Sequence, residues 1–166
     1  MRKIMMLFVA LLTLAAATPA AHAKKSIMEL PLFERAVLII KKFETLHKPK
    51  HWPTIGFGHV VQRGEPYRKG IQLTERQADA LLRKDLRKFV SLYKHMGERN
   101  AILLGTLAYN IGPGAVNRST VYKKLKRGDT NIYKEYTAHC HYKGKFHKQL
   151  HQRRQTELFW LYHTVK

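Results

Sequence analysis

The sequence predicts a mostly helical α+β protein with one small β segment near the N-terminus. Apolar residues recur at steps of three and four over several stretches of the chain, which is the spacing that buries one face of a helix. One glycine-punctuated segment, Thr54 to Val60, instead alternates small or polar residues with apolar ones, as a short strand does. The two patterns together predict a short strand beside a predominantly helical lobe.

The first 23 residues have the composition of a secretory signal peptide. Arg2 and Lys3 precede an apolar run from Ile4 to Ala17, and a small-x-small cleavage site ends at Ala23. The run is short for a transmembrane span. We expect cleavage after Ala23, which leaves residues 24–166 as a single domain in the periplasm or outside the cell. An uncleaved signal anchor is the alternative.

The chain carries a large excess of positive charge. Its 31 lysines and arginines against 11 acidic residues give a formal net charge of +20, and +18 once Arg2 and Lys3 are removed. Such an excess implies an anionic partner. Nucleic acid is the usual partner of so basic a chain, but the export signal argues against it and favours anionic polymers of the cell envelope.

The single cysteine, Cys140, excludes an intramolecular disulfide, so packing of the core must hold the fold. His139 and His141 flank Cys140, and His147 and His151 follow nearby. No spacing among these residues completes a coordination set, because neighbouring residues on a helix point in different directions. We therefore expect neither a metal nor another cofactor.

A helix is predicted to end near Glu44, the only acid between Lys41 and Val61. Its apolar stripe is formed by Leu32, Phe33, Ala36, Val37, Ile40 and Phe43. Apolar neighbours would disfavour the ionised form of the Glu44 carboxyl and let it donate a proton, as a general acid does. The alternative is that Glu44 ends the helix and pairs with a neighbouring lysine, namely Lys41, Lys48 or Lys50.

Further helices are predicted after a turn-rich connection between Val61 and Ile71. The first begins with a capping box formed by Thr74 and Gln77, and its apolar stripe ends at Tyr93. The second runs from Ala101 to Ala108 and stops at residues 110–114, and the third is capped by Ser119 and Thr120, continues through Val121 to Leu125 and ends at Gly128. The fourth begins at Thr130 and carries Ile132, Tyr133 and Tyr136. A lysine-rich break at Lys143 to Lys145 precedes a last, basic and amphipathic helix over Leu150 to Leu161.

These segments, in this order, resemble the phage-type lysozymes of glycoside hydrolase family 24. An acid at a helix end followed by TIGFGH resembles the active-site region of that family, and residues 105–129 resemble its second signature region. The C-terminal family pattern G-L-x-x-R-R-x-x-E is matched at Leu150, Arg153, Arg154 and Glu157, while Gln149 replaces the glycine.

The resemblance implies a lysozyme-like fold and a monomeric enzyme that cleaves the β-1,4 bond between MurNAc and GlcNAc in peptidoglycan. It assigns the catalytic roles to Glu44, as general acid, and to Thr54. The residues that it assigns to substrate binding are His59, Val60, Tyr109 and Ser119. Purely structural roles stay open for His59 as a strand-orienting residue, for Tyr109 in the core and for Ser119 as a helix cap.

The sequence departs from the family at one point that matters for mechanism: no aspartate lies between Glu44 and Thr54. An inverting glycosidase uses a second carboxylate roughly 6.5–9.5 Å from the acid to activate water. Three outcomes therefore stay open: hydrolysis with Thr54 and His51 or His59 positioning the water, a lytic transglycosylase reaction, or glycan binding without catalysis. If Glu44 is not the acid, Glu65 and Glu98 are the next candidates.

Overall fold

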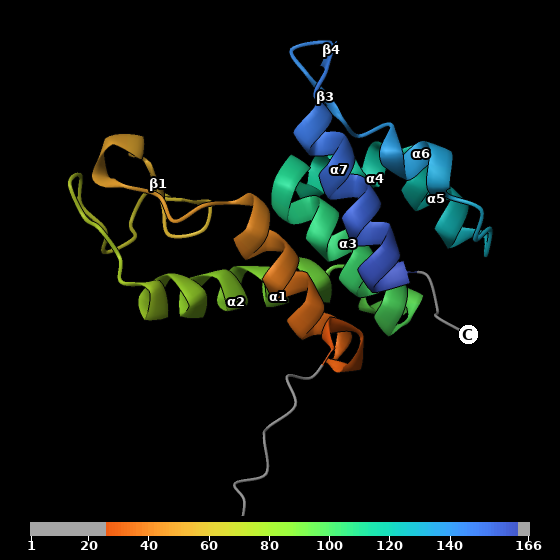
Figure 1. Cartoon of the computed structure of the whole chain (residues 1–166), viewed down its shortest axis with the longest axis horizontal. Helices are drawn as coiled ribbons and strands as arrows, with labels where there is room; N and C mark the ends of the chain where they lie inside the picture. Colours follow the sequence, from red (N-terminus) through yellow and green to blue (C-terminus); the bar gives the residue numbers. More distant parts are fainter. Residues whose placement is uncertain (1–25, 163–166) are drawn as a thin grey trace, which may run out of the picture.

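The structure is a computed structural model that describes residues 26–162, so the expected signal segment lies outside the described residues. The helices are η1 (Ile27–Glu29), α1 (Leu32–Phe43), η2 (Pro49–His51), α2 (Glu75–Ser91), η3 (Lys94–Met96), α3 (Glu98–Ile111), α4 (Pro113–Arg118), α5 (Thr120–Lys126), α6 (Tyr133–Thr137), α7 (Lys148–Glu157) and the π-helical turn η4 (Leu158–Tyr162). The strands are β1 (Thr54–Ile55), β2 (His59–Val60), β3 (His141–Tyr142) and β4 (Lys145–Phe146). Figure 1 shows the β1 region at one end and α3 to α7 gathered at the other.

Helix α1 confirms the predicted stripe. Ala36, Val37 and Ile40 are buried, and Ile39, which the stripe did not include, is buried as well. Glu44 caps the C-terminal end of the helix, where its backbone N–H donates to the carbonyl of Ile40 at 2.7 Å. The core that surrounds α1 therefore fixes the backbone from which the Glu44 side chain projects.

The glycine-punctuated segment forms a hairpin, so the expectation of one strand from Thr54 to Val60 was wrong. Strands β1 and β2 pair antiparallel, with Thr54 opposite Val60. Gly56 and Gly58 have φ angles of 57° and 99°, a region that residues with a Cβ seldom occupy, and the chain reverses between the two strands. The hairpin brings Gly58 beside the end of α1.

Helix α2 begins with the predicted capping box. The Thr74 hydroxyl accepts from the Gln77 N–H at 3.3 Å, and the Gln77 side chain accepts from the Thr74 N–H at 2.9 Å. The helix packs against α3, where a Cβ on Gly105 would lie 2.9 Å from the Cα of Val90. Glycine at this position therefore lets the two helices approach closely.

The C-terminal half departs from the predicted elements at three places. An additional short helix, α4, follows directly after Gly112, and the lysine-rich break contains the hairpin β3–β4. Helix α6 begins at Tyr133 rather than at Thr130, because the Asp129 carboxylate accepts from the Asn131 N–H at 2.9 Å and holds a turn there. The Ser119 cap is confirmed, since its hydroxyl accepts from the Tyr122 N–H at 3.1 Å.

Helix α7 is not the amphipathic helix that was expected. Its fully buried residues are Arg153, Arg154 and Glu157, and the apolar contacts come from the following turn, where Leu158 and Leu161 are buried. The three charges are tolerated in the interior because they pair with one another. None of the helices between residues 26 and 162 is long and apolar enough to cross a membrane.

Candidate active site

Glu44 is held by an arginine from the opposite end of the chain. Nη1 of Arg153, on α7, lies 2.5 Å from Oε1 of Glu44, and the two side chains are 3% and 22% exposed. The sequence predicts apolar neighbours for Glu44, and the structure adds a charged one that the sequence did not indicate. The alternative of a neighbouring lysine partner is not what the structure has, because Lys41 pairs with Glu75 and Asp79.

A buried network fixes Arg153 in turn. Its Nε donates to Oε1 of Glu157 at 3.0 Å, while the hydroxyl of Tyr136 donates to Oε2 at 2.8 Å. Burial opposes the charge of Arg153, but the carboxylates of Glu157 and Glu44 outweigh it and raise the pKa of Arg153. The family-like R-R-x-x-E spacing was the sequence signal for this network, although the pattern alone gave these residues no role.

Asn110 is a second neighbour of Glu44 that sequence reasoning did not assign to the site. Its Nδ2 donates to Oε1 of Glu44 at 3.5 Å, and its Oδ1 accepts from Nη2 of Arg154 at 2.7 Å. This pair of contacts fixes the orientation of the amide. Helices α3 and α7 thus both hold the carboxyl at the end of α1.

The third side of Glu44 is formed by the β1–β2 turn. A Cβ on Gly58 would lie 3.4 Å from Oε2 of Glu44 and 3.6 Å from Cε1 of Tyr109. The hydroxyl of Tyr109 donates to the carbonyl of Phe57 at 2.8 Å, and burial raises the pKa of Tyr109, so it stays a hydrogen-bond donor. The bare Gly58 backbone therefore fits between an acid and an aromatic ring.

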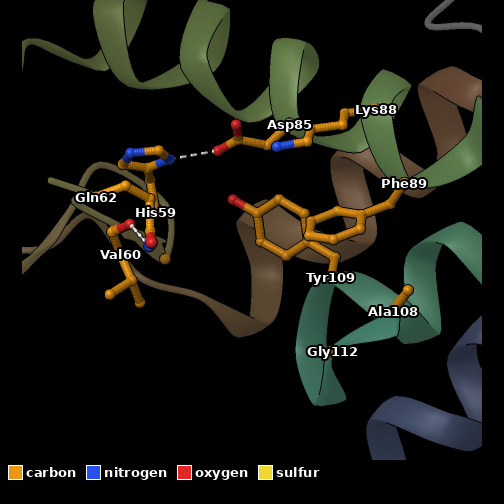
Figure 2. A pocket seen from close by; sticks show the side chains of 10 residues that line it. His59, Val60, Gln62, Asp85, Lys88, Phe89, Ala108, Tyr109 and Gly112 are labelled. Atoms are coloured by element: carbon orange, nitrogen blue, oxygen red, sulfur yellow. Dashed lines mark hydrogen bonds and ion pairs between the residues drawn. The ribbon is translucent and has the colours of Figure 1, made fainter. Parts of the chain in front are cut away.

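A pocket of about 310 Å³ opens beside this turn (Figure 2). It is lined by Gly58, His59, Val60, Gln62, Asp85, Lys88, Phe89, Ala108, Tyr109 and Gly112. Figure 2 shows the Tyr109 ring beneath Asp85 and close to Phe89. Three of the four residues that the resemblance assigned to substrate binding therefore share one pocket, and Glu44 stands behind its Gly58 wall.

The remaining two predicted site residues lie elsewhere in the fold. Thr54 is half-buried in β1 and pairs with Val60, so it belongs to the same hairpin as the pocket wall. Ser119 lies in a different pocket, whose lining includes Arg118 and Lys134. Its hydroxyl is occupied as a helix cap and also donates to the carbonyl of Val116 at 2.7 Å.

His59 is clamped between two carboxylates at the pocket edge. Its Nδ1 lies 2.6 Å from Oδ2 of Asp85 and its Nε2 lies 2.8 Å from Oε2 of Glu65. The hydrogen bond to Asp85 outweighs burial and, together with the one to Glu65, raises the pKa of His59. Both ring nitrogens act as donors, so His59 offers no lone pair to take a proton from water.

Two further histidines, His47 and His51, lie in the segment between Glu44 and Thr54, and their rings have different hydrogen-bond partners. Nδ1 of His51 accepts from the Lys48 N–H at 3.0 Å, so the neutral ring carries its proton on Nε2. Nδ1 of His47 lies 3.2 Å from the carbonyl of Gly56, to which it donates, and Nε2 of His47 then keeps its lone pair. His47, which sequence reasoning did not consider, is the better proton acceptor of the two.

The site has no arrangement typical of a metal centre. In the part of the chain that the structure describes, no group of three or more His, Cys, Asp or Glu side chains is placed to hold an ion. Cys140 is buried, apart from the pocket residues, and its sulfur lies 3.8 Å from Nδ1 of His141.

Comparison with known families shows which family the chain belongs to. The sequence profile of the family described as Phage lysozyme matches residues 41–157, which span Glu44, the hairpin and the buried network of α7. The chain belongs to the phage lysozyme family. It is therefore a lysozyme-type glycosidase that degrades peptidoglycan, and its mostly helical fold with small sheets is that of the phage lysozymes.

Individual relatives agree with the family match. An endolysin of Acyrthosiphon pisum secondary endosymbiont phage 1 is 29% identical over 107 residues, which cover 58% of this chain and 70% of the endolysin. The muramidase domain of SpmX from Asticaccaulis excentricus superposes with a TM-score of 0.66 at 25% identity, over 78% of this chain and 96% of that domain. An endolysin from Escherichia coli O157:H7 phage FAHEc1 gives a TM-score of 0.64 at 25% identity, over 83% and 98% of the two chains.

Proposed function

We propose that this phage-type lysozyme cleaves the β-1,4 bond between MurNAc and GlcNAc, with Glu44 as the general acid that protonates the glycosidic oxygen. The observation that carries the proposal is that the two oxygens of the Glu44 carboxyl have different surroundings. Arg153 and Asn110 contact Oε1, while Oε2 faces the Gly58 wall of the pocket. A carboxyl that is fixed on one oxygen and free on the other is suited to deliver a proton in one direction.

An inverting mechanism also uses a second carboxylate to activate water, and no acid near the pocket is free to act as one. All eleven acidic residues lie within the described residues, and the two that border or approach the pocket, Asp85 and Glu65, are both engaged by His59. A free carboxylate that could activate water opposite Glu44 is therefore not offered by either of them.

Two ways of completing the reaction fit this arrangement. In hydrolysis, Thr54 positions the water and a histidine takes its proton, and the hydrogen bonds favour His47 over His51 and His59 for that step. In a lytic transglycosylase reaction, the C6 hydroxyl of the muramic acid attacks its own C1 and gives its proton to Glu44, so no water is needed.

The proposed setting is outside the cytoplasm. Export with cleavage after Ala23 would deliver residues 24–166 to the peptidoglycan layer as a single-domain monomer, and the net positive charge would favour anionic envelope polymers over nucleic acid as partners. N-terminal sequencing of the exported protein tests this. A product that begins at Lys24 supports cleavage, and a membrane-held product that begins at Met1 supports the anchor instead.

The general-acid role is tested by Glu44→Gln. This change keeps the size of the side chain and its contact with Arg153 but removes the transferable proton, so turnover on peptidoglycan should fall by roughly 10²-fold or more. Glu98→Gln, on the exposed first turn of α3, is the matched control and should keep wild-type turnover. Equal activity of Glu44→Gln and wild type would remove Glu44 from the mechanism.

Two further substitutions separate hydrolysis from transglycosylation. Thr54→Ala and His47→Asn should each reduce a reaction that depends on a positioned water, by roughly 10-fold or more. A transglycosylase takes its nucleophile from the substrate, so both variants should then stay near wild-type turnover. His51→Asn serves as the control in either case.

A further inference from the structure

The hairpin β3–β4 is an exposed segment that the glycosidase site does not use. Residues 141–149 are all exposed, and Figure 1 shows β3 and β4 projecting beyond the surrounding helices. Of the large apolar side chains that stay exposed between residues 26 and 162, Tyr142 and Phe146 are the two most exposed, at 61% and 60%. Single exposed apolar residues are common on protein surfaces, but two on one hairpin of six residues are not.

The two aromatic rings lie on opposite faces of the hairpin. Tyr142 is opposite Lys145 and His141 is opposite Phe146, and successive residues of a strand point to opposite faces. The ring contact of His141 with Phe146, at 6.3 Å between centroids, agrees with this register. A flat sugar-stacking surface would place its rings on one face. Rings on both faces instead suit immersion of the whole tip in an apolar or interfacial medium.

The charge around the rings has one sign. Lys143, Lys145 and Lys148 lie within the exposed segment, and no acidic residue lies between Glu135 and Glu157. The ammonium of Lys143 stands 5.5 Å from the centre of the Tyr142 ring. The tip therefore combines aromatic side chains with lysines and has no carboxylate to repel an anionic surface.

We propose that the hairpin β3–β4 docks this protein on anionic phospholipid membranes, with Tyr142 and Phe146 entering the headgroup region and Lys143 and Lys145 contacting lipid phosphates. Aromatic rings partition to the membrane interface, and each lysine near an anionic leaflet strengthens binding. The contact is peripheral. It would hold the enzyme at the membrane surface that adjoins the peptidoglycan layer.

Vesicle binding by the full chain tests the charged part of the proposal. Vesicles of phosphatidylglycerol and phosphatidylcholine should bind Lys143→Gln/Lys145→Gln about thirtyfold more weakly than wild type, the change expected for two lysines at an anionic surface. Lys123→Gln/Lys126→Gln, which removes the same charge from the exposed face of α5, should have a much smaller effect. Wild type and all variants carry the same residues 1–25, so any contact of those residues with the vesicles is the same in each protein. Equal weakening by the two double variants would overturn the proposal, because net charge alone would then explain binding.

Quenching of tryptophan fluorescence by brominated lipids tests whether the aromatic side chains of the hairpin enter the membrane. In Tyr142→Trp, the added tryptophan fluorescence should be quenched by brominated phospholipids in the same vesicles, whereas Leu92→Trp, at a 49% exposed position that caps the C-terminal end of α2, should not be quenched. Failure of Tyr142→Trp to show quenching would contradict insertion. Loss of binding to purified peptidoglycan or to DNA in Tyr142→Ser/Phe146→Ser, with vesicle binding unchanged, would assign the hairpin to those partners and also overturn the proposal.

Discussion

Gly58 is the residue at which the β1–β2 hairpin meets Glu44, the proposed general acid. Its φ of 99° is strained for any residue with a Cβ, and that atom would stand 3.4 Å from Oε2 of Glu44. Gly64 has a similar φ of 91° but nothing within 4 Å of the corresponding position. Both glycines therefore have a positive φ that disfavours a Cβ, but only Gly58 lies next to Glu44.

This pair gives the first prediction. Gly58→Ala should lower turnover by roughly 10-fold or more, because backbone strain at a φ of 99° falls on the turn that contacts Glu44 and the added methyl group would cover Oε2 at van der Waals distance. Gly64→Ala should lose comparable stability from backbone strain but keep its turnover per folded molecule. Steady-state kinetics, corrected for the folded fraction by circular dichroism, would check both. Equal turnover of the two variants would speak against the close packing of Gly58 on Glu44.

The second prediction concerns how the ionisation of His59 affects the stability of the fold. Because Asp85 first, and Glu65 as well, raise the pKa of His59 above the ordinary value of about 6.5, its ion pairs stabilise the fold fully below that value. This contribution is lost as the pH rises through the raised pKa. The free energy of unfolding of wild type relative to His59→Asn should thus be largest near pH 5–6 and shrink towards alkaline pH.

NMR titration of the His59 ring measures the cause directly. Its midpoint should lie above about 6.5 in the wild type and move down in Asp85→Asn, which removes the largest interaction. A midpoint at or below the ordinary value in the wild type would mean that the two carboxylates do not hold the ring in the charged form.

At the scale of elements, the longer helices α1, α2 and α3 followed from the sequence, whereas helix α4, the character of α7 and the geometry of the site did not. The stripes of α1 and α2 and the capping box at Thr74 were readable because burial and capping depend on residues three and four apart. The reversal between β1 and β2 was missed because glycines were read as allowing close approach rather than a change of direction. The pairing of Arg153 with Glu44 joins positions 109 residues apart, and no local pattern predicts such a contact.

Helix α7 shows the same limit, since an amphipathic basic helix was expected and the fold instead buries Arg153 and Arg154. Arg154 and Glu157 are both fully buried, and Glu157 contacts both arginines and Tyr136. The second acid that pairs with Arg153 is Glu44, which lies outside α7, at the C-terminal end of α1.

The third prediction concerns this buried network. Glu157→Gln would leave two buried guanidinium groups with less compensation, so the free energy of unfolding should fall by roughly 3–5 kcal/mol. Glu98→Gln removes a charge from an exposed helix position and should change it by less than about 1 kcal/mol. Denaturant titration would measure both. A small effect of Glu157→Gln would show that Arg153 and Arg154 are held by packing rather than by this carboxylate.

At the scale of the whole molecule, we expect net positive charge to dominate association with the cell envelope. The formal net charge, which is +20 for the full chain and +18 without Arg2 and Lys3, should make binding to purified anionic cell-wall preparations weaken steeply once salt reduces the Debye length to about 8 Å, near 0.15 M. Sedimentation of the protein with such preparations at rising salt provides the measurement. Retention that does not change with salt would mean that hydrogen bonds and apolar contacts to sugars carry the binding.

The central claim is that Glu44 drives cleavage of the glycan strand, and mass spectrometry of digested peptidoglycan tests it most directly. Wild-type protein should release muropeptides cut between MurNAc and GlcNAc, ending either in a reducing MurNAc or, for a transglycosylase, in its 1,6-anhydro form, which is lighter by one water. Glu44→Gln should release neither above background while it still binds the polymer. Digestion by Glu44→Gln at the wild-type level, or no cleavage product from the wild type, would contradict the account.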